Sequence, residues 1–290
     1  MGSFASINGE IVPLEEARVP ILDNGFVFGD SVYEVLRTYG GRPFESGRHL
    51  RRMRASAGRL GIPIPATNAE LLAQVRALLT RAGDIESYIR IVVTRGVGNL
   101  SYDLDAVVGP TVVMIQKPLR PPVRSHYDEG IRVSAVDIRR NHRRSLDPAI
   151  KSSNLLNNIL AVREAKARGA EEAVLLNLEG FVAEGASTNV FAVKDGTVST
   201  PPLSAGILGG ITREVVLELA ASLEIPCREE ALKLRDLLEA DEAFLSSTTR
   251  EVMPIRQVDN HLIGNGRPGP LTRRLMEAFR AYTTIPSPMA

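Results

Sequence analysis

The sequence predicts an α/β protein of two domains, in which the larger C-terminal domain is dominated by strands. The chain has 290 residues, enough for one large or two ordinary domains. Segments that alternate like strands are interleaved with segments at helical spacing. The stretch "KPLRPPVR" at 117–124 contains three prolines and predicts a stiff extended connector. We therefore expect an N-terminal α/β domain over 1–118, a connector over 119–124 and a C-terminal domain over 125–290.

The N-terminal half combines hairpins with two helices. Residues 4–13 read as two strands around an Asn8-Gly9 turn, and 30–44 as a strand that turns at Gly40-Gly41. Apolar residues then fall at helical spacing in "SGRHLRRMRASAGRLGI", where Gly61 and Pro63 end the helix. A second helix is expected over 68–83, from an Asn68 cap to Gly83, followed by strands at 87–96 and 111–119.

The C-terminal half is expected to contain more strands than helices. A strand begins "GIRVSAVDIRR", and 171–201 reads as a series of strands with turns at Glu179-Gly180 and Asp195-Gly196. Two further strands flank a Ser/Thr-rich loop near 246–251. Helices are expected at 155–169, 211–225 and roughly 270–282.

The composition excludes several classes of protein. With 44% hydrophobic and 24% charged residues and a net charge of +1, the chain has the composition of a soluble globular protein and no overall field for nucleic acid or an anionic membrane. It has no 18-residue apolar run and no secretion signal. The single cysteine, Cys227, and four scattered histidines give no disulfide framework and no metal-ligand spacing. We expect a cytoplasmic enzyme with no nucleic-acid or membrane partner.

Three features point to an anionic phosphate. "GILGGITREV" places two glycines and a threonine at a helix start, where free N–H groups and the helix dipole favour an anion. "SSTTRE" at 246–251 offers hydroxyls and turn amides after a strand. An arginine from the 48–59 cluster can add positive charge. Each feature is also compatible with an ordinary turn, capped loop or solvated helix face.

Lys151 and Glu184 form a second set of candidate residues, an amine nucleophile and a carboxylate. Lys151 is one of only five lysines beside thirty arginines, and it lies in a small-residue turn ahead of an apolar helix. An amine nucleophile needs such a setting to lose its proton. Glu184, in "FVAEGASTN", can hydrogen-bond a protonated pyridine nitrogen. Spacing alone leaves open that both are ordinary surface or turn charges.

Together these segments resemble the class IV (fold-type IV) pyridoxal-phosphate aminotransferases, which include branched-chain and D-amino acid aminotransferases and aminodeoxychorismate lyase. The resemblance covers essentially the whole chain. Its motifs are "FGDSVYEVLRTY", "HLRRM", "IKSSNLLNNILAVREAKARGAEEAVLLN", "VAEGASTNVFAVKDG", "ILGGITREVV" and "LSSTTREVMPI", in the family's order. It implies a two-domain fold whose C-terminal domain is a pseudo-barrel, pyridoxal 5'-phosphate as cofactor, and ping-pong transfer of an amino group from an amino donor to a 2-oxo acid. It also implies a homodimer whose active site lies between the domains and is completed by the second subunit.

The resemblance also implies a role for individual residues. Lys151 matches the Schiff-base lysine, Glu184 the partner of the pyridine nitrogen, and Arg52 the phosphate-binding arginine of the motif H-x-x-R-[LM]. The other implied cofactor ligands are Leu208, Ile211, Thr212, Ser247 and Thr248. The implied substrate residues are Tyr33, Tyr88, Arg90 and Thr249, with Arg37 as a further candidate for the substrate carboxylate.

The substrate signals are mixed. "SYIRIVV" resembles the Y-x-R element of branched-chain enzymes, although Tyr88 and Arg90 also suit one polar face of a strand. "VYEV" resembles D-amino acid aminotransferases, but Leu100 and Tyr102 replace their R-x-H carboxylate trap. Ser247-Thr248-Thr249 departs from the G-T-A of branched-chain members, and Arg90 argues against an (R)-amine transaminase.

We therefore expect a branched-chain-type L-amino acid:2-oxoglutarate aminotransferase. An atypical D-amino acid aminotransferase that binds the carboxylate through Arg90 or Arg37 is the first alternative. An (R)-amine transaminase and a lyase of the aminodeoxychorismate type follow. A non-catalytic cofactor-storing or scaffold protein has no support in these residues.

Overall fold

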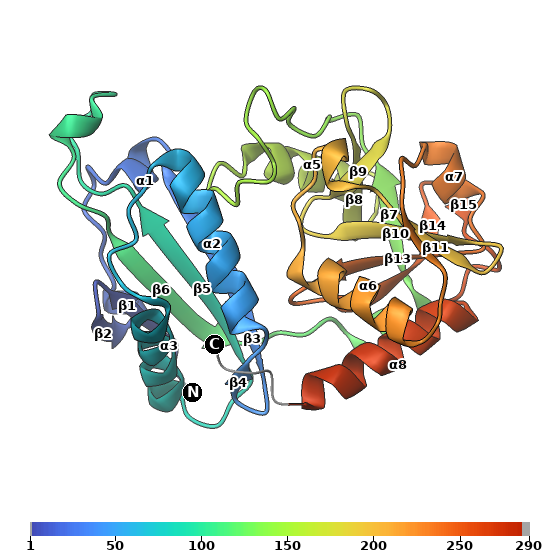
Figure 1. The fold of residues 1–290 in the computed structure, drawn as a ribbon, viewed down its shortest axis with the longest axis horizontal. Helices are drawn as coiled ribbons and strands as arrows, with labels where there is room; N and C mark the ends of the chain where they lie inside the picture. Colours follow the sequence, from blue (N-terminus) through green and yellow to red (C-terminus); the bar gives the residue numbers. More distant parts are fainter. Residues whose placement is uncertain (1, 286–290) are drawn as a thin grey trace. The chain divides into compact units, whose positions relative to one another are not determined.

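The computed structural model describes residues 2–285, which divide into two compact units (Figure 1). The first contains residues up to Arg120 together with Ile150–Asn154, and the second contains Pro121–Ala149 and Leu155–Ile285. Residues 150–154 lie in the range expected for the C-terminal domain, yet they pack in the first unit. They pack there because the backbone of this segment hydrogen-bonds to Ser31 and Tyr33 of the first unit.

The first unit is built on a six-stranded sheet in the order β2-β1-β6-β5-β3-β4. All neighbouring strands in it are antiparallel. The long strand β3, which carries several of the predicted site residues, lies next to β5. The strand bounds are β1 Phe4–Ile7, β2 Glu10–Pro13, β3 Ser31–Tyr39, β4 Arg42–Pro43, β5 Ser87–Thr94 and β6 Val112–Pro118.

Two 15-residue helices, α2 (Ser46–Leu60) and α3 (Asn68–Ala82), bury their apolar stripes against this sheet (Figure 1). The core holds Leu50, Met53 and Ala57 of α2 with Leu71, Val75 and Leu78 of α3. Because side chains alternate along a strand, β3 sends Val32 and Leu36 into this core and Tyr33 and Arg37 to its opposite face. The shorter elements of the unit are η1 (Leu14–Glu16), α1 (Asn24–Val27) and η2 (Leu104–Ala106).

The second unit contains a curled nine-stranded sheet. Eight strands follow the order β12-β11-β10-β13-β14-β7-β8-β9, and β15 pairs with β14. Three of the pairings, β14 with β7, β7 with β8 and β11 with β12, are parallel. The strand bounds are β7 Ile131–Ala135, β8 Glu172–Leu176, β9 Val182–Gly185, β10 Asn189–Lys194, β11 Thr197–Thr200, β12 Cys227–Glu229, β13 Glu242–Ser247, β14 Glu251–Val258 and β15 His261–Leu262.

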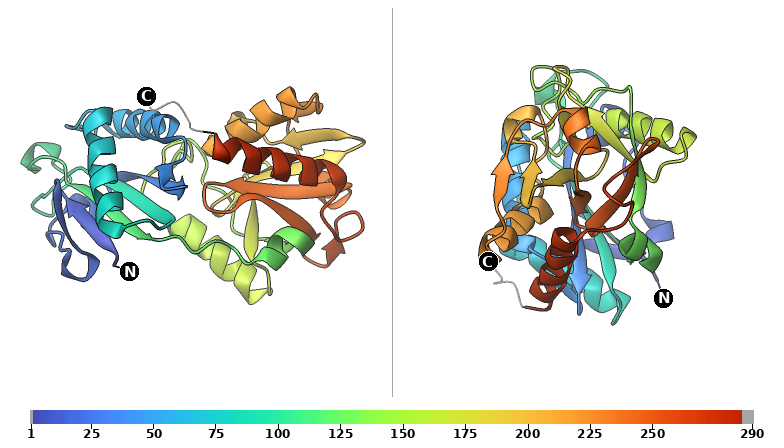
Figure 2. Two further views of the ribbon diagram at one scale, coloured as in Figure 1. Left: turned by 90° about the horizontal axis from the view of Figure 1, so that it is seen from below. Right: turned by 90° about the vertical axis from the view of Figure 1, so that its right-hand side faces the viewer.

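Helices cover this sheet, and α6 and α8 pack against each other beside β13 (Figure 2). Helix α5 packs against β7 and β8. The helix bounds are α4 Arg124–Glu129, α5 Leu156–Ala167, η3 Leu203–Ala205, α6 Ile211–Ser222, α7 Leu234–Leu238 and α8 Pro270–Thr284. Within residues 2–285 the structure has no helix that is both long enough and apolar enough to cross a membrane.

The long elements lie where the sequence places them, and the differences are local. Helix α3 is capped by Thr67 rather than by the expected Asn68, because Thr67 and Glu70 form a reciprocal capping box. The strand expected to continue from 130 to 140 ends at Ala135. Short elements such as α4, α7 and β12 were not expected, since a few residues give too little periodicity to detect.

Candidate active site

The predicted site residues fall into two groups, one in each unit. The first unit contains Tyr33, Arg37, Arg52, Tyr88, Arg90 and Lys151, and the second contains Glu184, Leu208, Ile211, Thr212, Ser247, Thr248 and Thr249. Each group gathers around a small set of hydrogen bonds, so the two groups are described in turn.

Lys151 lies beside β3 in the first unit. Its carbonyl oxygen accepts a hydrogen bond from the Tyr33 amide at 2.9 Å, and the Ser153 amide donates to the Ser31 carbonyl at 3.0 Å. The Lys151 Nζ atom lies 4.6 Å from the centroid of the Tyr33 ring. Tyr33 therefore lies against the lysine through both main-chain and side-chain contacts.

Arg52 is held by a carboxylate that the sequence analysis did not single out. Arg52 donates from Nε to Oε1 of Glu34 at 2.7 Å and from Nη2 to Oε2 at 2.8 Å. His49 Nδ1 lies 2.7 Å from the same Oε2 atom. Both Glu34 and His49 are completely buried, so this cluster joins α2 to β3 inside the first unit.

The charge states in this cluster follow from its contacts. Burial raises the pKa of Glu34, but the charges and hydrogen bonds of Arg52 and His49 outweigh it and hold that pKa well below its ordinary value. Burial, together with the nearby positive charges of Arg52 and Lys151, lowers the pKa of His49 below its ordinary value, although Glu34 acts in the opposite direction. Glu34 is thus ionised and His49 neutral at pH 7, with His49 donating its Nδ1 proton to the carboxylate.

The predicted substrate residues of the first unit share one face of the sheet. In the pairing of β3 with β5, Tyr33 lies opposite Val92, Val35 opposite Arg90 and Arg37 opposite Tyr88. The Arg90 guanidinium lies 4.0 Å from the centroid of the Tyr33 ring. Arg37 stacks at the same distance on Tyr39. Two arginines, two tyrosines and two valines thus lie on the face that carries Tyr33.

Glu184 is the central acceptor of the second group. Its Oε1 accepts a hydrogen bond from Arg140 Nε at 2.7 Å, and its Oε2 accepts from the Leu208 amide at 3.0 Å and from Asn189 Nδ2 at 3.4 Å. Arg140 is oriented in turn by Asn157, whose Oδ1 accepts from Nη1 at 3.0 Å. Glu184, at the end of β9, is thereby linked to Leu208.

The start of α6 fits a phosphate group. Thr212 is 2% exposed, and its Oγ1 has no hydrogen-bond partner among the described residues. A Cβ at Gly210 would lie 2.0 Å from Oδ1 of Asn189, so only glycine fits there. A buried hydroxyl beside the open amides of a helix N-terminus can bind an anionic oxygen. The residues present thus fit the phosphate of the cofactor that the sequence resemblance implies.

The loop between β13 and β14 carries the remaining hydroxyls. Thr248 and Thr249 form its turn, and Ser247 Oγ accepts a hydrogen bond from the Arg250 amide at 3.3 Å. Arg250 Nη1 lies 3.0 Å from Oε2 of Glu172, a buried carboxylate that also accepts from two backbone amides. The contact of Arg250 with Glu172 therefore anchors the loop that carries Ser247, Thr248 and Thr249.

Sequence reasoning missed the partners of the predicted residues. Glu34 left a detectable signal, because it occupies a core-facing position of β3 between Val32 and Leu36. Arg140 and Asn189 left none, since the first follows another arginine in irregular chain and the second is one polar residue among several. Both residues matter because they contact Glu184, which lies 44 positions from Arg140 and 5 positions from Asn189 in the sequence.

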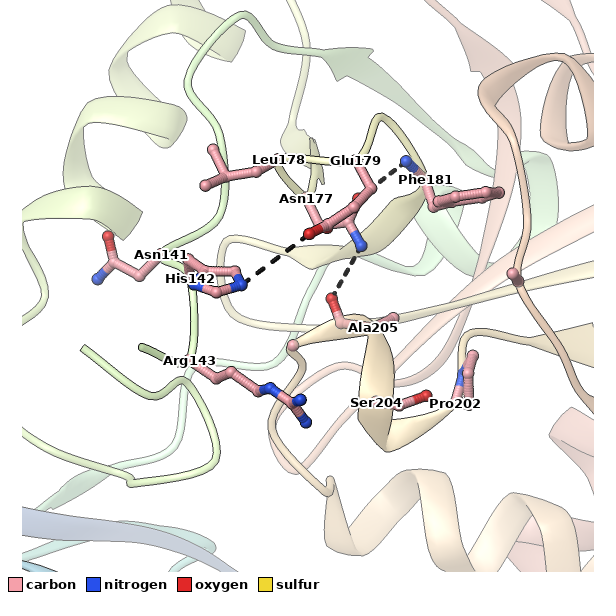
Figure 3. Close-up of a pocket in the computed structure, with 12 residues that line it drawn as sticks. Asn141, His142, Arg143, Asn177, Leu178, Glu179, Phe181, Pro202, Ser204 and Ala205 are labelled. Carbon is pink, nitrogen blue, oxygen red and sulfur yellow. Dashed lines mark hydrogen bonds and ion pairs between the residues drawn. The ribbon is translucent and has the colours of Figure 1, made fainter. Parts of the chain in front are cut away.

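A separate cavity in the second unit holds none of the predicted site residues (Figure 3). It measures about 290 Å³ and is lined by the loop at 141–143, the turn at 177–181 and the segment around η3. Its polar groups bond mainly to one another. Asn177 Nδ2 donates to the Ala205 carbonyl at 3.3 Å, and His142 Nε2 lies 3.9 Å from Glu179 Oε1. The two groups above are therefore the better candidates for chemistry.

The chain is similar to characterised proteins over almost its full length. Residues 31–258 match the family model for amino-transferase class IV. A Methanocaldococcus jannaschii protein with the provisional name branched-chain-amino-acid aminotransferase is 41% identical over 96% of each chain. D-alanine aminotransferase of Bacillus licheniformis is 36% identical over 94% of each chain.

Solved structures with the same fold carry branched-chain names. The Escherichia coli branched-chain amino acid aminotransferase superposes with a TM-score of 0.93 at 31% identity, covering 97% of this chain and 94% of the other. The branched-chain amino acid aminotransferase of T.th., solved with pyridoxamine 5'-phosphate, gives a TM-score of 0.92 at 30% identity, covering 98% of this chain and 95% of the other.

We expect Glu34→Gln to destabilise the protein at neutral pH by about 3–5 kcal/mol, because it leaves Arg52 without its buried counter-charge. Ionised Glu34 stabilises the fold fully above its ordinary pKa of 4.5, and this contribution is lost as the pH falls towards the lowered pKa of the folded state. The deficit of the variant should therefore shrink below about pH 4.5. Urea unfolding of wild type and variant across pH measures it, with the exposed Glu10→Gln as control. A deficit independent of pH would contradict the charge assignment.

Proposed function

The chain belongs to the class IV aminotransferases and is a pyridoxal-phosphate transaminase, and from that premise we propose its reaction and the roles of its residues. The proposed reaction moves the amino group of a branched-chain-type L-amino acid to 2-oxoglutarate. It proceeds by a ping-pong mechanism, in which the 2-oxo acid product leaves before the acceptor binds. The observation that carries the proposal is the placement of Lys151 Nζ against the Tyr33 ring of β3, which also contacts Arg90 of the neighbouring strand β5.

Lys151 is proposed as the catalytic residue. Its Nζ would hold the cofactor covalently and would accept the proton from the substrate Cα. Pyridoxal phosphate, when bound, supplies an electron sink for that deprotonation. Glu184 holds the proton on the pyridine nitrogen. Its ion pair with Arg140 and the Leu208 amide favour the ionised carboxylate that this role needs.

Several of the predicted residues are proposed to bind the phosphate. The buried Thr212 hydroxyl and the backbone of Ile211 at the start of α6 support this role, as does the fixed guanidinium of Arg52. Ser247 and Thr248 add hydroxyls, and Leu208 packs on the ring.

For the substrate, the face of β3 and β5 supports a carboxylate next to an apolar side chain. Arg90 supplies the positive charge, and Val35 and Val92 lie on the same face as Tyr33. Tyr88 and the backbone of Thr249 are the other proposed contacts. A branched aliphatic side chain suits the two valines, since β-branched side chains offer apolar surface without polar groups to satisfy.

A D-amino acid is the second candidate. Two observations favour it, namely the similarity to D-alanine aminotransferase and the presence of Arg37 on the same face as Arg90. Two arginines can bind the carboxylate without an R-x-H trap. The positions where that trap would lie, Leu100 and Tyr102, are 61% and 87% exposed.

We also propose that the protein is a homodimer. Two segments of the first unit, 19–28 and 97–108, are joined by the hydrogen bond from the Gly98 amide to the Leu22 carbonyl. Together they expose a set of large apolar side chains, which we call the apolar patch: Val19, Ile21, Leu22, Phe26, Leu100, Tyr102, Leu104 and Val108. Apolar patches of this kind are typical of protein interfaces.

A cytoplasmic location remains a prediction from the sequence.

Borohydride reduction of the loaded enzyme, followed by peptide mapping, should place the cofactor on Lys151. Lys117 provides the internal control, because it lies in the same unit without an assigned role. Lys151→Ala should lose all turnover while keeping the far-UV circular dichroism of the wild type. A label on another lysine, or near-normal activity of the variant, would rule out Lys151 as the nucleophile.

A donor panel with 2-oxoglutarate tests the substrate. Of L-Leu, L-Val, L-Glu, D-Ala, D-Glu and (R)-1-phenylethylamine, L-Leu and L-Val should give the highest kcat/KM, because the valine-lined face suits them. Faster turnover of D-Ala than of L-Leu would contradict the branched-chain proposal and favour a D-amino acid as the substrate. Release of more than one equivalent of product per active site without any added 2-oxo acid would indicate a lyase.

Phe26→Glu, which puts a charge into the apolar patch, should shift the protein from dimer to monomer in sedimentation velocity, because a buried unpaired charge opposes association. Leu262→Glu is the matched control, since Leu262 is also exposed but lies outside the patch. A wild-type monomer, or equal effects of both variants, would remove the patch as the interface.

A further inference from the structure

Ser56 contacts the main chain of Lys151 from helix α2. Its side chain is almost completely buried, with 2% of the residue exposed. Its Oγ accepts a hydrogen bond from the backbone N–H of Lys151, with an N···Oγ distance of 3.1 Å. The two residues are 95 positions apart, so this bond fixes the lysine segment to a helix that is distant in the sequence.

The main chain of Lys151 is thus held on two sides. Its N–H donates to Ser56 of α2, and its carbonyl accepts from Tyr33 of β3 at 2.9 Å. The neighbouring Asn154 side chain donates to the Gly29 carbonyl, also at 2.9 Å. The peptide groups on both sides of the Lys151 Cα are thus held by hydrogen bonds, and this restricts where the Lys151 side chain begins.

Helix α2 is itself rigidly attached to β3. Ser56 follows Arg52 by four residues, so the two lie on the same face of the helix, about 6 Å apart along its axis. Arg52 and His49 anchor that face to the buried carboxylate of Glu34. The hydroxyl that holds Lys151 therefore projects from the same anchored face as the arginine proposed for the phosphate.

We propose that Ser56 is a positioning residue for Lys151, acting through the backbone N–H of the lysine. The proposal rests on Lys151 being the residue that carries the cofactor. Without the Ser56 oxygen, the Lys151 N–H would lose this acceptor and would have to bond elsewhere. The peptide would turn to find another partner and would carry Nζ away from its place beside the Tyr33 ring. Small displacements of a reacting group lower rates steeply.

A purely structural serine would behave differently. It would contribute to the stability of the fold and leave the reactivity of the lysine unchanged. The chain contains a matched control, because Ser6 is also a buried serine of the first unit, at 1% exposed, and its Oγ has no hydrogen-bond partner among the described residues. Removing each hydroxyl separates the loss of a polar atom from the loss of the contact with Lys151.

The first experiment uses the apoprotein and needs no turnover. Amide hydrogen exchange of Lys151, followed in wild type, Ser56→Ala and Ser6→Ala, reports directly on the bond. The Lys151 amide should be protected in wild type and in Ser6→Ala and should exchange at least tenfold faster in Ser56→Ala. If Ser56→Ala does not fold, exchange of the Lys151 amide in the wild type decides. Protection of that amide would support the proposal, and exchange as fast as that of an exposed amide would overturn it.

The second experiment follows attachment of pyridoxal phosphate to the apoenzyme by its visible absorbance. Ser56→Ala should attach the cofactor about tenfold more slowly than wild type, and Ser6→Ala within twofold of it. Equal rates for Ser56→Ala and wild type would overturn the positioning role while leaving the function of Lys151 intact. Failure of wild type to attach the cofactor at Lys151 would instead overturn the proposed function.

Discussion

The buried carboxylate of Glu34 is the constraint on which the first unit depends. An ionised carboxylate inside a protein is tolerated only when it is paired and hydrogen-bonded, and Arg52 and His49 supply both. The carboxylate in turn fixes the side chains of Arg52 and His49, because both hydrogen-bond to it. Helix α2 is thereby held in one position against β3. That position sets where Arg52 and Ser56 lie.

The same strand connects this constraint to the chemistry. Glu34 lies between Tyr33 and Val35, so the alternation of β3 places the carboxylate on the helix side and Tyr33 on the opposite side. The Tyr33 amide binds Lys151, and the Tyr33 ring packs under both Lys151 Nζ and Arg90. One well-anchored strand thus fixes Arg52 through Glu34 and Lys151 through Tyr33.

The second unit uses buried carboxylates in the same way. Glu184 accepts hydrogen bonds from Arg140, from Asn189 and from the Leu208 amide, and so ties the end of β9 to the segment before α6. Glu172 similarly connects the start of β8 to the loop around Thr248 through Arg250. In both cases irregular chain is held by a charged hydrogen-bond acceptor, which allows a loop to carry functional groups in a defined place.

The family, the cofactor, the transaminase activity and the long helices and strands could all be predicted from the sequence. Apolar periodicity, glycine turns and ordered motifs are local signals, so they can be read without coordinates. The folded structure was needed to see that Ile150–Asn154 packs in the first unit. It was also needed to see three contacts, in which Glu34 holds Arg52, Arg140 holds Glu184 and Ser56 holds the Lys151 amide. The last three are single hydrogen-bonded contacts between residues 18, 44 and 95 positions apart. Apart from the core-facing position of Glu34, such contacts leave no periodic pattern in the sequence, because they depend on where folding brings two distant segments together.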